Sequence, residues 1–202
     1  MSHYAELHLH SAYSFLTGTS EPDELVKRAT ELELSALAIT DYDGFPGVVR
    51  FAQAARKYCM PTVIGSELRL AKHGPHMVVL SKSVAGYQTL SRCIGEAFLA
   101  SSEKSSATYD IATLAERSKN LWHIFTGARH SHVYRVLEQK SGVWAVESAR
   151  RELQGLIDLF GKDNIAMELV AYGDPYDRER RLLLQRHCRG SRCSMCGNWG
   201  CP

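Results

Sequence analysis

Short apolar runs alternate with segments of helical periodicity along most of this chain, and this alternation limits the possible folds more than any other feature. Strands are predicted at residues 36–40, 61–67, 77–80, 121–126 and 165–170. Helices are predicted between them, the longest at residues 85–100 and 143–160. This order predicts an α/β domain with mostly parallel strands. With 202 residues, of which 45% are hydrophobic, the chain can bury a sizeable core.

Charge and hydropathy narrow the class of protein. The formal net charge of +2 is too small to argue by itself for binding to nucleic acid or to a membrane surface. No apolar run in the sequence approaches the ~20 residues that a membrane-spanning helix needs. The first residues carry no pattern of a secretory signal, so a cytoplasmic location is predicted.

The N-terminal segment Glu6-Leu7-His8-Leu9-His10-Ser11 alternates leucine with histidine, which is the period of a short strand. Both imidazoles therefore point to one face of that strand. Two histidines on one face suit a metal site, because neutral imidazole is a common ligand for divalent metals. On this motif alone, two merely polar and half-exposed histidines remain the simpler interpretation.

Polar side chains follow several of the predicted strands. They are His8, His10, Asp41 and Glu67, together with the turn at Gly127. In a (β/α) barrel the functional residues gather at the C-terminal ends of the strands. We therefore expect side chains that are distant in the sequence to share one pocket.

Several long strings of the sequence carry a resemblance to a known family, at residues 4–16, 38–44, 47–52, 86–92 and 173–175. They resemble the PHP (polymerase and histidinol phosphatase) family, and in particular the N-terminal PHP domain of bacterial error-prone DNA polymerases of the polymerase III alpha-subunit type. The similarity extends from about Tyr4 to Arg181. The resemblance implies a distorted (β/α) barrel of seven strands. Active members hold up to three divalent metals and hydrolyse phosphoesters, whereas other members have lost their metals and only support the polymerase structure.

The match to the ligand pattern of the family is partial. His8, His10 and Glu67 stand where the resemblance implies metal ligands. These three groups can hold one divalent ion at most, which would be Zn, Mn or Mg, and no ion is required if the site is degenerate. Both outcomes remain open at this point.

Three other ligand positions of the family pattern have changed. Thr17 replaces an acidic residue, Tyr42 replaces a histidine, and Ala128 replaces a cysteine or histidine. Threonine, tyrosine and alanine are poor ligands for such ions. His130 and His132 lie near the last position and could substitute, although a place in a surface loop is the simpler interpretation.

The C-terminal residues differ in composition from the rest of the chain. Four of the six cysteines of the chain crowd the end, at Cys188, Cys193, Cys196 and Cys201. The spacing imitates a zinc knuckle. Reading the codons shifted by one base would instead permit an apolar strand of the type Cys-Val-Val-Thr-Gly-Ala-Val, which resembles the family at this point. We therefore predict an incomplete PHP domain at residues 1–184, truncated before its last strand, and a frameshifted, non-native tail at residues 185–202.

The functional expectation is an N-terminal PHP-domain fragment of an error-prone DNA polymerase, with a structural role and a degenerate metal site. The intact family protein is a DNA-directed DNA polymerase, a nucleotidyltransferase of damage-tolerant synthesis and repair, whose partners are DNA and its own polymerase domains. The polymerase palm is not within these residues. The first alternative is a PHP-type metal-dependent phosphoesterase. The second is a small zinc-binding interaction protein, which rests only on the tail.

Overall fold

The structure is a computed structural model. It describes residues 4–70, 74–101, 107–126, 129–137, 145–171, 173–191 and 194–198. For residues 186–191 and 194–198 only the backbone is described.

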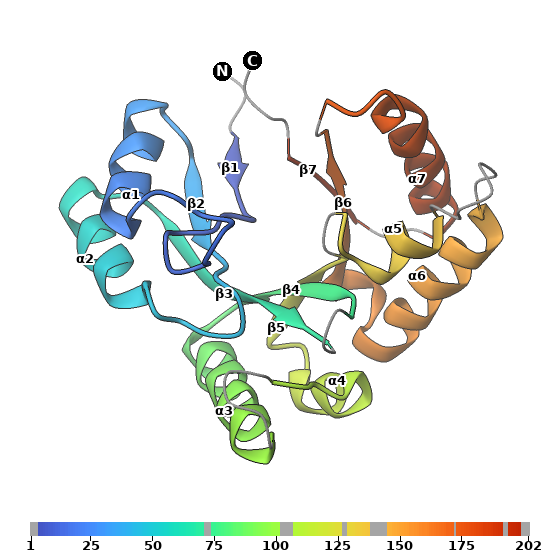
Figure 1. Cartoon of the computed structure of the whole chain (residues 1–202), viewed down its shortest axis with the longest axis horizontal. Coiled ribbons are helices and arrows are strands. Elements are labelled where there is room, and N and C mark those ends of the chain that lie inside the picture. Colours follow the sequence, from blue (N-terminus) through green and yellow to red (C-terminus); the bar gives the residue numbers. More distant parts are fainter. Residues whose placement is uncertain are drawn as a thin grey trace.

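One curled sheet organises the chain (Figure 1). Its strands are β1 (Ala5–Glu6), β2 (Ala36–Ile39), β3 (Thr62–Arg69), β4 (His76–Ser81), β5 (Trp122–Phe125), β6 (Ile165–Val170) and β7 (Ser194–Asn198), in that order across the sheet. All neighbouring pairs are parallel except those that β4 makes with β3 and β5. β4 is antiparallel because the link from β3 is far shorter than the crossover that a parallel pair requires.

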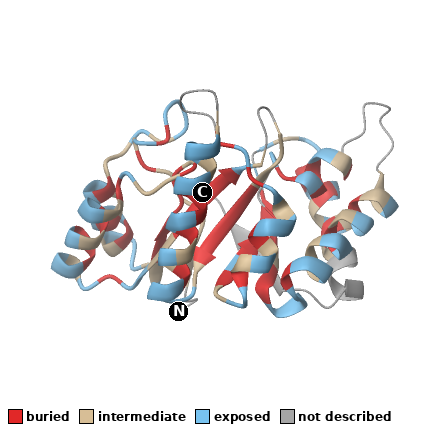
Figure 2. Cartoon of the chain, turned by 90° about the horizontal axis from the view of Figure 1, so that it is seen from below, coloured by how far each residue is buried: buried red, intermediate tan, exposed pale blue. Residues whose placement is uncertain are grey.

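Helices cover the outer face of this sheet (Figure 1). They are α1 (Pro22–Glu31), α2 (Val48–Tyr58), α3 (Val84–Ala100), α4 (Ile111–Ser118), α5 (His132–Leu137), α6 (Val146–Phe160) and α7 (Asp177–Ser191), with a short 3₁₀ helix at Lys162–Asn164. Figure 2 shows the strands largely buried, and the helices exposed on their outward sides. The predicted α/β architecture is therefore confirmed.

The sheet does not close into a complete barrel. β1 and β7 are its two edges, and they face each other across the opening in Figure 1. The predicted domain is truncated before its last strand, whereas in the structure five tail residues pair parallel with β6 as β7. Backbone pairing explains this, because the exposed edge of β6 offers hydrogen-bonding groups that do not depend on the side chains of the incoming segment.

Alternation along the strands divides the core into two layers. Outward-facing residues such as Trp122 and Met167 pack under the helices, together with Leu153 of α6. Inward-facing residues form a smaller cluster inside the curl, and it is made of Ala38, Val78, Leu80 and Phe125, with Leu7, Val63 and Ala166 packed against it. Because successive side chains on a strand point to opposite faces, the inner face of β3 and β6 continues from this cluster toward the site described below.

The first strand is shorter than predicted. β1 ends at Glu6, so His8 and His10 lie in the segment that follows it rather than within a strand. One side-chain and one backbone hydrogen bond take the place of the ladder here: the Leu9 N–H donates to Thr40 Oγ1 at 3.0 Å, and the Thr40 N–H donates to the Leu9 carbonyl at 2.9 Å. These bonds hold the segment beside the end of β2.

Acidic residues cap the N-termini of two helices. Asp110 caps α4, and its carboxylate accepts from the Thr113 N–H at 2.9 Å. At the start of α1, Glu21 rather than the preceding Ser20 is the N-cap, and it forms a reciprocal capping box with Glu24. Serine and glutamate side chains can both accept a backbone N–H, so the sequence pattern alone does not show which of the two residues caps the helix.

Gly65 of β3 lies where the neighbouring strand leaves no room for a side chain. A Cβ atom there would lie 2.4 Å from the Val79 carbonyl oxygen and 2.7 Å from Leu80 Cδ2. Replacing Gly65 by alanine is therefore expected to lower the free energy of unfolding by roughly 1–3 kcal/mol, because strand backbone must shift.

Urea unfolding measures this effect. Gly95→Ala is the matched control, since Gly95 lies in α3 with nothing within 4 Å of the added Cβ. The control is expected to stabilise the helix by up to ~1 kcal/mol. Equal unfolding midpoints for the two variants would contradict the close packing of β3 against β4.

Candidate metal centre

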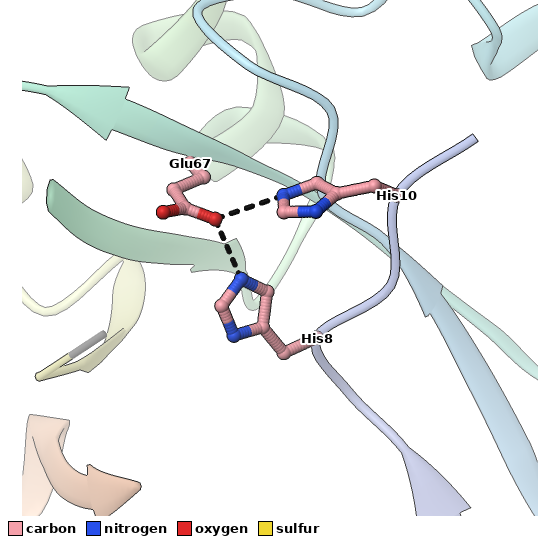
Figure 3. Close-up of side chains that lie close together, drawn as sticks. All are labelled: His8, His10 and Glu67. Atoms are coloured by element: carbon pink, nitrogen blue, oxygen red, sulfur yellow. Dashed lines mark hydrogen bonds and ion pairs between the residues drawn. The ribbon is translucent and has the colours of Figure 1, made fainter. Parts of the chain in front are cut away.

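Glu67 of β3 is the centre of a cluster of histidines (Figure 3). Its carboxylate is buried, and Oε2 lies 2.7 Å from Nε2 of His8 and 2.8 Å from Nε2 of His10. The other oxygen, Oε1, lies 2.6 Å from Nδ1 of His76 at the start of β4. The structure thus brings together the three predicted ligands and adds a fourth polar contact.

His8 lies between two carboxylates. Its Nε2 faces Glu67, and its Nδ1 lies 2.7 Å from Oε1 of Glu168 on β6. Burial opposes a charge on this imidazole, but the hydrogen bonds to Glu168 and Glu67 outweigh it and raise the pKa of His8 to about 10. Without a metal, His8 is therefore an imidazolium at neutral pH, and a bound cation would have to displace its proton.

The same contacts act on Glu67 in the opposite direction. Burial favours the neutral acid, yet the hydrogen bonds from His10, His76 and His8 hold the pKa of this carboxyl far below its usual range. Glu67 is therefore ionised throughout the physiological range. A permanently charged carboxylate surrounded by imidazoles can bind a metal cation, or it can accept hydrogen bonds from the ring N–H groups of the histidines.

Asp41, the polar residue that follows β2, anchors the segment that carries His10. Its buried carboxylate accepts from the Ser11 N–H at 2.8 Å, from the Ser11 hydroxyl at 2.7 Å and from the Ser14 hydroxyl at 2.6 Å. All of these contacts are to the loop rather than to the histidines. Asp41 therefore has a structural role beside the site.

Removing the Asp41 carboxylate is expected to loosen this loop. Asp41→Ala leaves three donors of the loop without their acceptor and should lower the free energy of unfolding by roughly 2–4 kcal/mol. Asp158→Ala, at an exposed position of α6, serves as the control and should change it by less than about 0.5 kcal/mol. A thermal melt of both variants that shows equal small shifts would refute the anchoring role.

Two of the changed ligand positions contact each other. The side chain of Thr17 is a polar neighbour of the Tyr42 phenol and acts to lower the pKa of Tyr42. The Tyr42 ring lies against His10, with ring centres 4.6 Å apart, and meets His76 edge-on at 5.6 Å. Burial and the charge of Glu67 raise the pKa of Tyr42, so the phenol stays neutral. The third changed position, Ala128, lies outside the described residues.

The geometry admits one divalent ion. One ligand atom each from His8, His10 and Glu67 lie within 4.8 Å of one another, and no other such group of three occurs in the part of the chain that the structure describes. Ligand bonds of about 2.0–2.2 Å place tetrahedral ligand atoms about 3.3 Å apart. The two imidazoles would therefore need to move from Glu67 by about half an ångström. The neutral side chains of Thr17 and Tyr42 do not provide a comparable second set of ligands for another ion.

Sequence reasoning missed His76 and Glu168. His76 directly precedes an apolar run, and Glu168 interrupts one, so each carried a weak local signal. His130 is exposed as predicted, but its ring also lies against His76, with centres 5.0 Å apart. His132 is exposed on α5 and lies 3.4 Å from Glu152, away from this cluster.

A curled, incomplete α/β barrel with two histidines and a glutamate at the ends of its strands defines a domain with a site suited to divalent metal. The chain belongs to the PHP domain family, whose model matches residues 6–171. This confirms the resemblance that the sequence strings indicate.

Curated relatives are much longer than this chain. The error-prone DNA polymerase of Mycobacterium tuberculosis is 44% identical over 190 residues, and that of Mycolicibacterium paratuberculosis is 43% identical over 190 residues. The corresponding polymerase of Cutibacterium acnes is 40% identical over 200 residues. The chain spans 17% of the length of each of these relatives, while 90% to 93% of the chain is matched.

Solved structures share the fold at low sequence identity. A Bifidobacterium adolescentis protein described as a metal-dependent phosphoesterase is 16% identical, with a TM-score of 0.60 over 98% of this chain and 87% of that one. An amidohydrolase from Chromobacterium violaceum is 18% identical, with a TM-score of 0.53 over 96% of this chain and 86% of that one. In the described part of the chain, no helix combines the length and apolar character needed to cross a membrane.

Proposed function

We propose that this chain is the N-terminal PHP portion of an error-prone DNA polymerase and that it acts there as a structural domain. The relatives named above support the first part of this proposal. Its partners would be the polymerase domains of the intact protein and, through them, DNA in damage-tolerant synthesis and repair. A cytoplasmic location goes with this role.

The observation that carries the structural role is the pairing of Thr17 with Tyr42. Two neighbouring ligand positions of the family pattern hold the neutral side chains of Thr17 and Tyr42 here, and the Tyr42 ring fills space beside His10. In a phosphoesterase with clustered metals, the metal ions together stabilise both the attacking and the leaving oxygen. A site reduced to three ligands lacks that arrangement.

The remaining site would hold a single divalent ion. Its mixed donor set of two imidazoles and one carboxylate suits Zn, and also Mn or Mg to a lesser degree. When bound, such an ion supplies positive charge that could polarise a phosphoryl oxygen. His8 and His10 would bind it through Nε2, and Glu67 through Oε2.

Metal content and phosphodiesterase activity of the purified chain test this proposal. We expect one equivalent of metal or less, and no hydrolysis of bis-p-nitrophenyl phosphate or single-stranded DNA above the buffer control. Hydrolysis that disappears in a His8→Ala variant would reject the structural role and support the alternative, a PHP-type metal-dependent phosphoesterase. The coding sequence downstream provides a second test, because a polymerase palm there supports the polymerase assignment.

The tail is a separate proposal. We infer that residues 185–202 are read in a shifted frame and are not native to the family domain that ends near residue 184. The pairing of β7 with β6 is compatible with this, since an open sheet edge accepts many segments. The side chains of the four tail cysteines lie outside the described residues. Resequencing of the gene decides the question, and an unchanged frame together with tightly bound zinc in the tail would reject the inference.

A further inference from the structure

Glu168 makes the most remote contact of the metal centre. It lies on β6, 160 residues from His8, and its Oε1 accepts from Nδ1–H of His8 at 2.7 Å. Only 1% of Glu168 is exposed. A buried carboxylate in an otherwise apolar strand is costly unless it has a specific partner, so this contact requires an explanation.

The backbone around Glu168 is held on both sides. Its N–H donates to the Thr126 hydroxyl at 3.3 Å, and its carbonyl accepts from the Tyr134 hydroxyl at 3.1 Å. Within β6 it shares the inner face with Ala166, which packs against the inner cluster. The side chain is therefore directed into the curl of the sheet from a rigid element rather than from a mobile loop.

The two carboxylate oxygens of Glu168 have different environments. Oε1 holds His8, whereas Oε2 is buried and has no hydrogen-bond partner among the described residues. The contact with His8 is thus the interaction that compensates the burial of this side chain. A carboxylate that accepts from one ring nitrogen of a ligand histidine fixes which nitrogen is left for the metal.

We propose that Glu168 is a positioning residue: it holds the His8 ring through Nδ1, so that Nε2 is the nitrogen presented to a divalent cation beside His10 and Glu67. This inference rests on the proposed one-ion site. His8 lies in an irregular segment after the two-residue strand β1. Glu168 supplies the orientation that a regular strand would otherwise give.

The test uses the full chain and Mn²⁺ alone as the probe, because Mn²⁺ prefers carboxylate and imidazole to the thiolates of the tail. Glu168→Gln keeps the shape of the side chain and removes its charge. Glu152→Gln is the matched control. Glu152 is a partly exposed glutamate of α6, and its carboxylate lies 3.4 Å from His132, away from the metal centre. We expect Glu168→Gln to weaken Mn²⁺ binding by about 10–100-fold in calorimetry, and the control to leave it within about twofold.

A spectroscopic readout separates positioning from mere stability. In the metal-free wild type, Nδ1–H of His8 should give a slowly exchanging, downfield proton resonance. That resonance should move upfield in Glu168→Gln, because a neutral amide oxygen accepts more weakly than a carboxylate. It should be unchanged in Glu152→Gln. The wild-type spectrum needs no variant, so the test stands even if Glu168→Gln fails to fold.

The outcomes are distinct. If the wild type binds Mn²⁺ and Glu168→Gln binds it equally well, the positioning role is overturned and the one-ion site stands. If the wild type shows no hydrogen-bonded Nδ1–H of His8, the positioning role is also overturned. If the wild type binds no Mn²⁺, the one-ion site is rejected, and the positioning role with it.

Discussion

Replacing Glu67 by glutamine is expected to abolish divalent-metal binding and to lower the free energy of unfolding by about 3–5 kcal/mol. The physical reason is that one buried carboxylate contacts His8, His10 and His76 at 2.6–2.8 Å. Glutamine keeps the shape but leaves these imidazoles without their common negative partner. The imidazole of His8 would then retain its ion pair with Glu168.

Urea unfolding in EDTA measures the change in the free energy of unfolding, and titration with Mn²⁺ measures the loss of metal binding. Because EDTA removes any metal, the loss of stability reports on the ion pairs alone. Glu152→Gln is again the control, since its side chain is partly exposed and exposed ion pairs contribute only about 0–1 kcal/mol. An unfolding midpoint of Glu67→Gln that equals the control would show that the cluster does not stabilise the fold.

Restoring the family ligands at two of the three changed positions, Thr17 and Tyr42, is the second change with a large expected effect. The double variant Thr17→Asp, Tyr42→His is expected to raise the Mn²⁺ stoichiometry of the chain from one to two. The two positions contact each other and lie beside His10, so an aspartate and a histidine there would face the existing ligands. The change also removes the neutral ring that occupies this space.

The single variants are the controls for this experiment. Because the two positions are in contact, their effects should not add, and neither Thr17→Asp nor Tyr42→His alone should bind the second ion tightly. Mass spectrometry of the native protein and calorimetry count the ions directly. A double variant that still binds one ion would show that Thr17 and Tyr42 are not what limits the site.

Local patterns predicted most of the secondary structure correctly, because the periodicity of apolar residues is a property of neighbouring positions. β4, β5 and β6 and the long helices α3 and α6 lie close to where the sequence places them. The strand predicted at the N-terminus is too long, since the alternation of Leu7, His8, Leu9 and His10 resembles a strand even where one side-chain and one backbone hydrogen bond with Thr40 replace the ladder. Periodicity does not report which partner satisfies the backbone.

The strings that resemble the PHP family marked His8, His10 and Glu67 as one group of ligand positions and Thr17 and Tyr42 as changed ones, because such strings are readable in one dimension. Only the tertiary structure brought Glu168 and His76 to the same centre. It also paired Thr17 with Tyr42. The physical reason is the curl of the sheet, which places the inner faces of β3 and β6 opposite one another across strands that are far apart in the chain, so that contacts 160 residues apart depend on sheet order and register rather than on any local pattern.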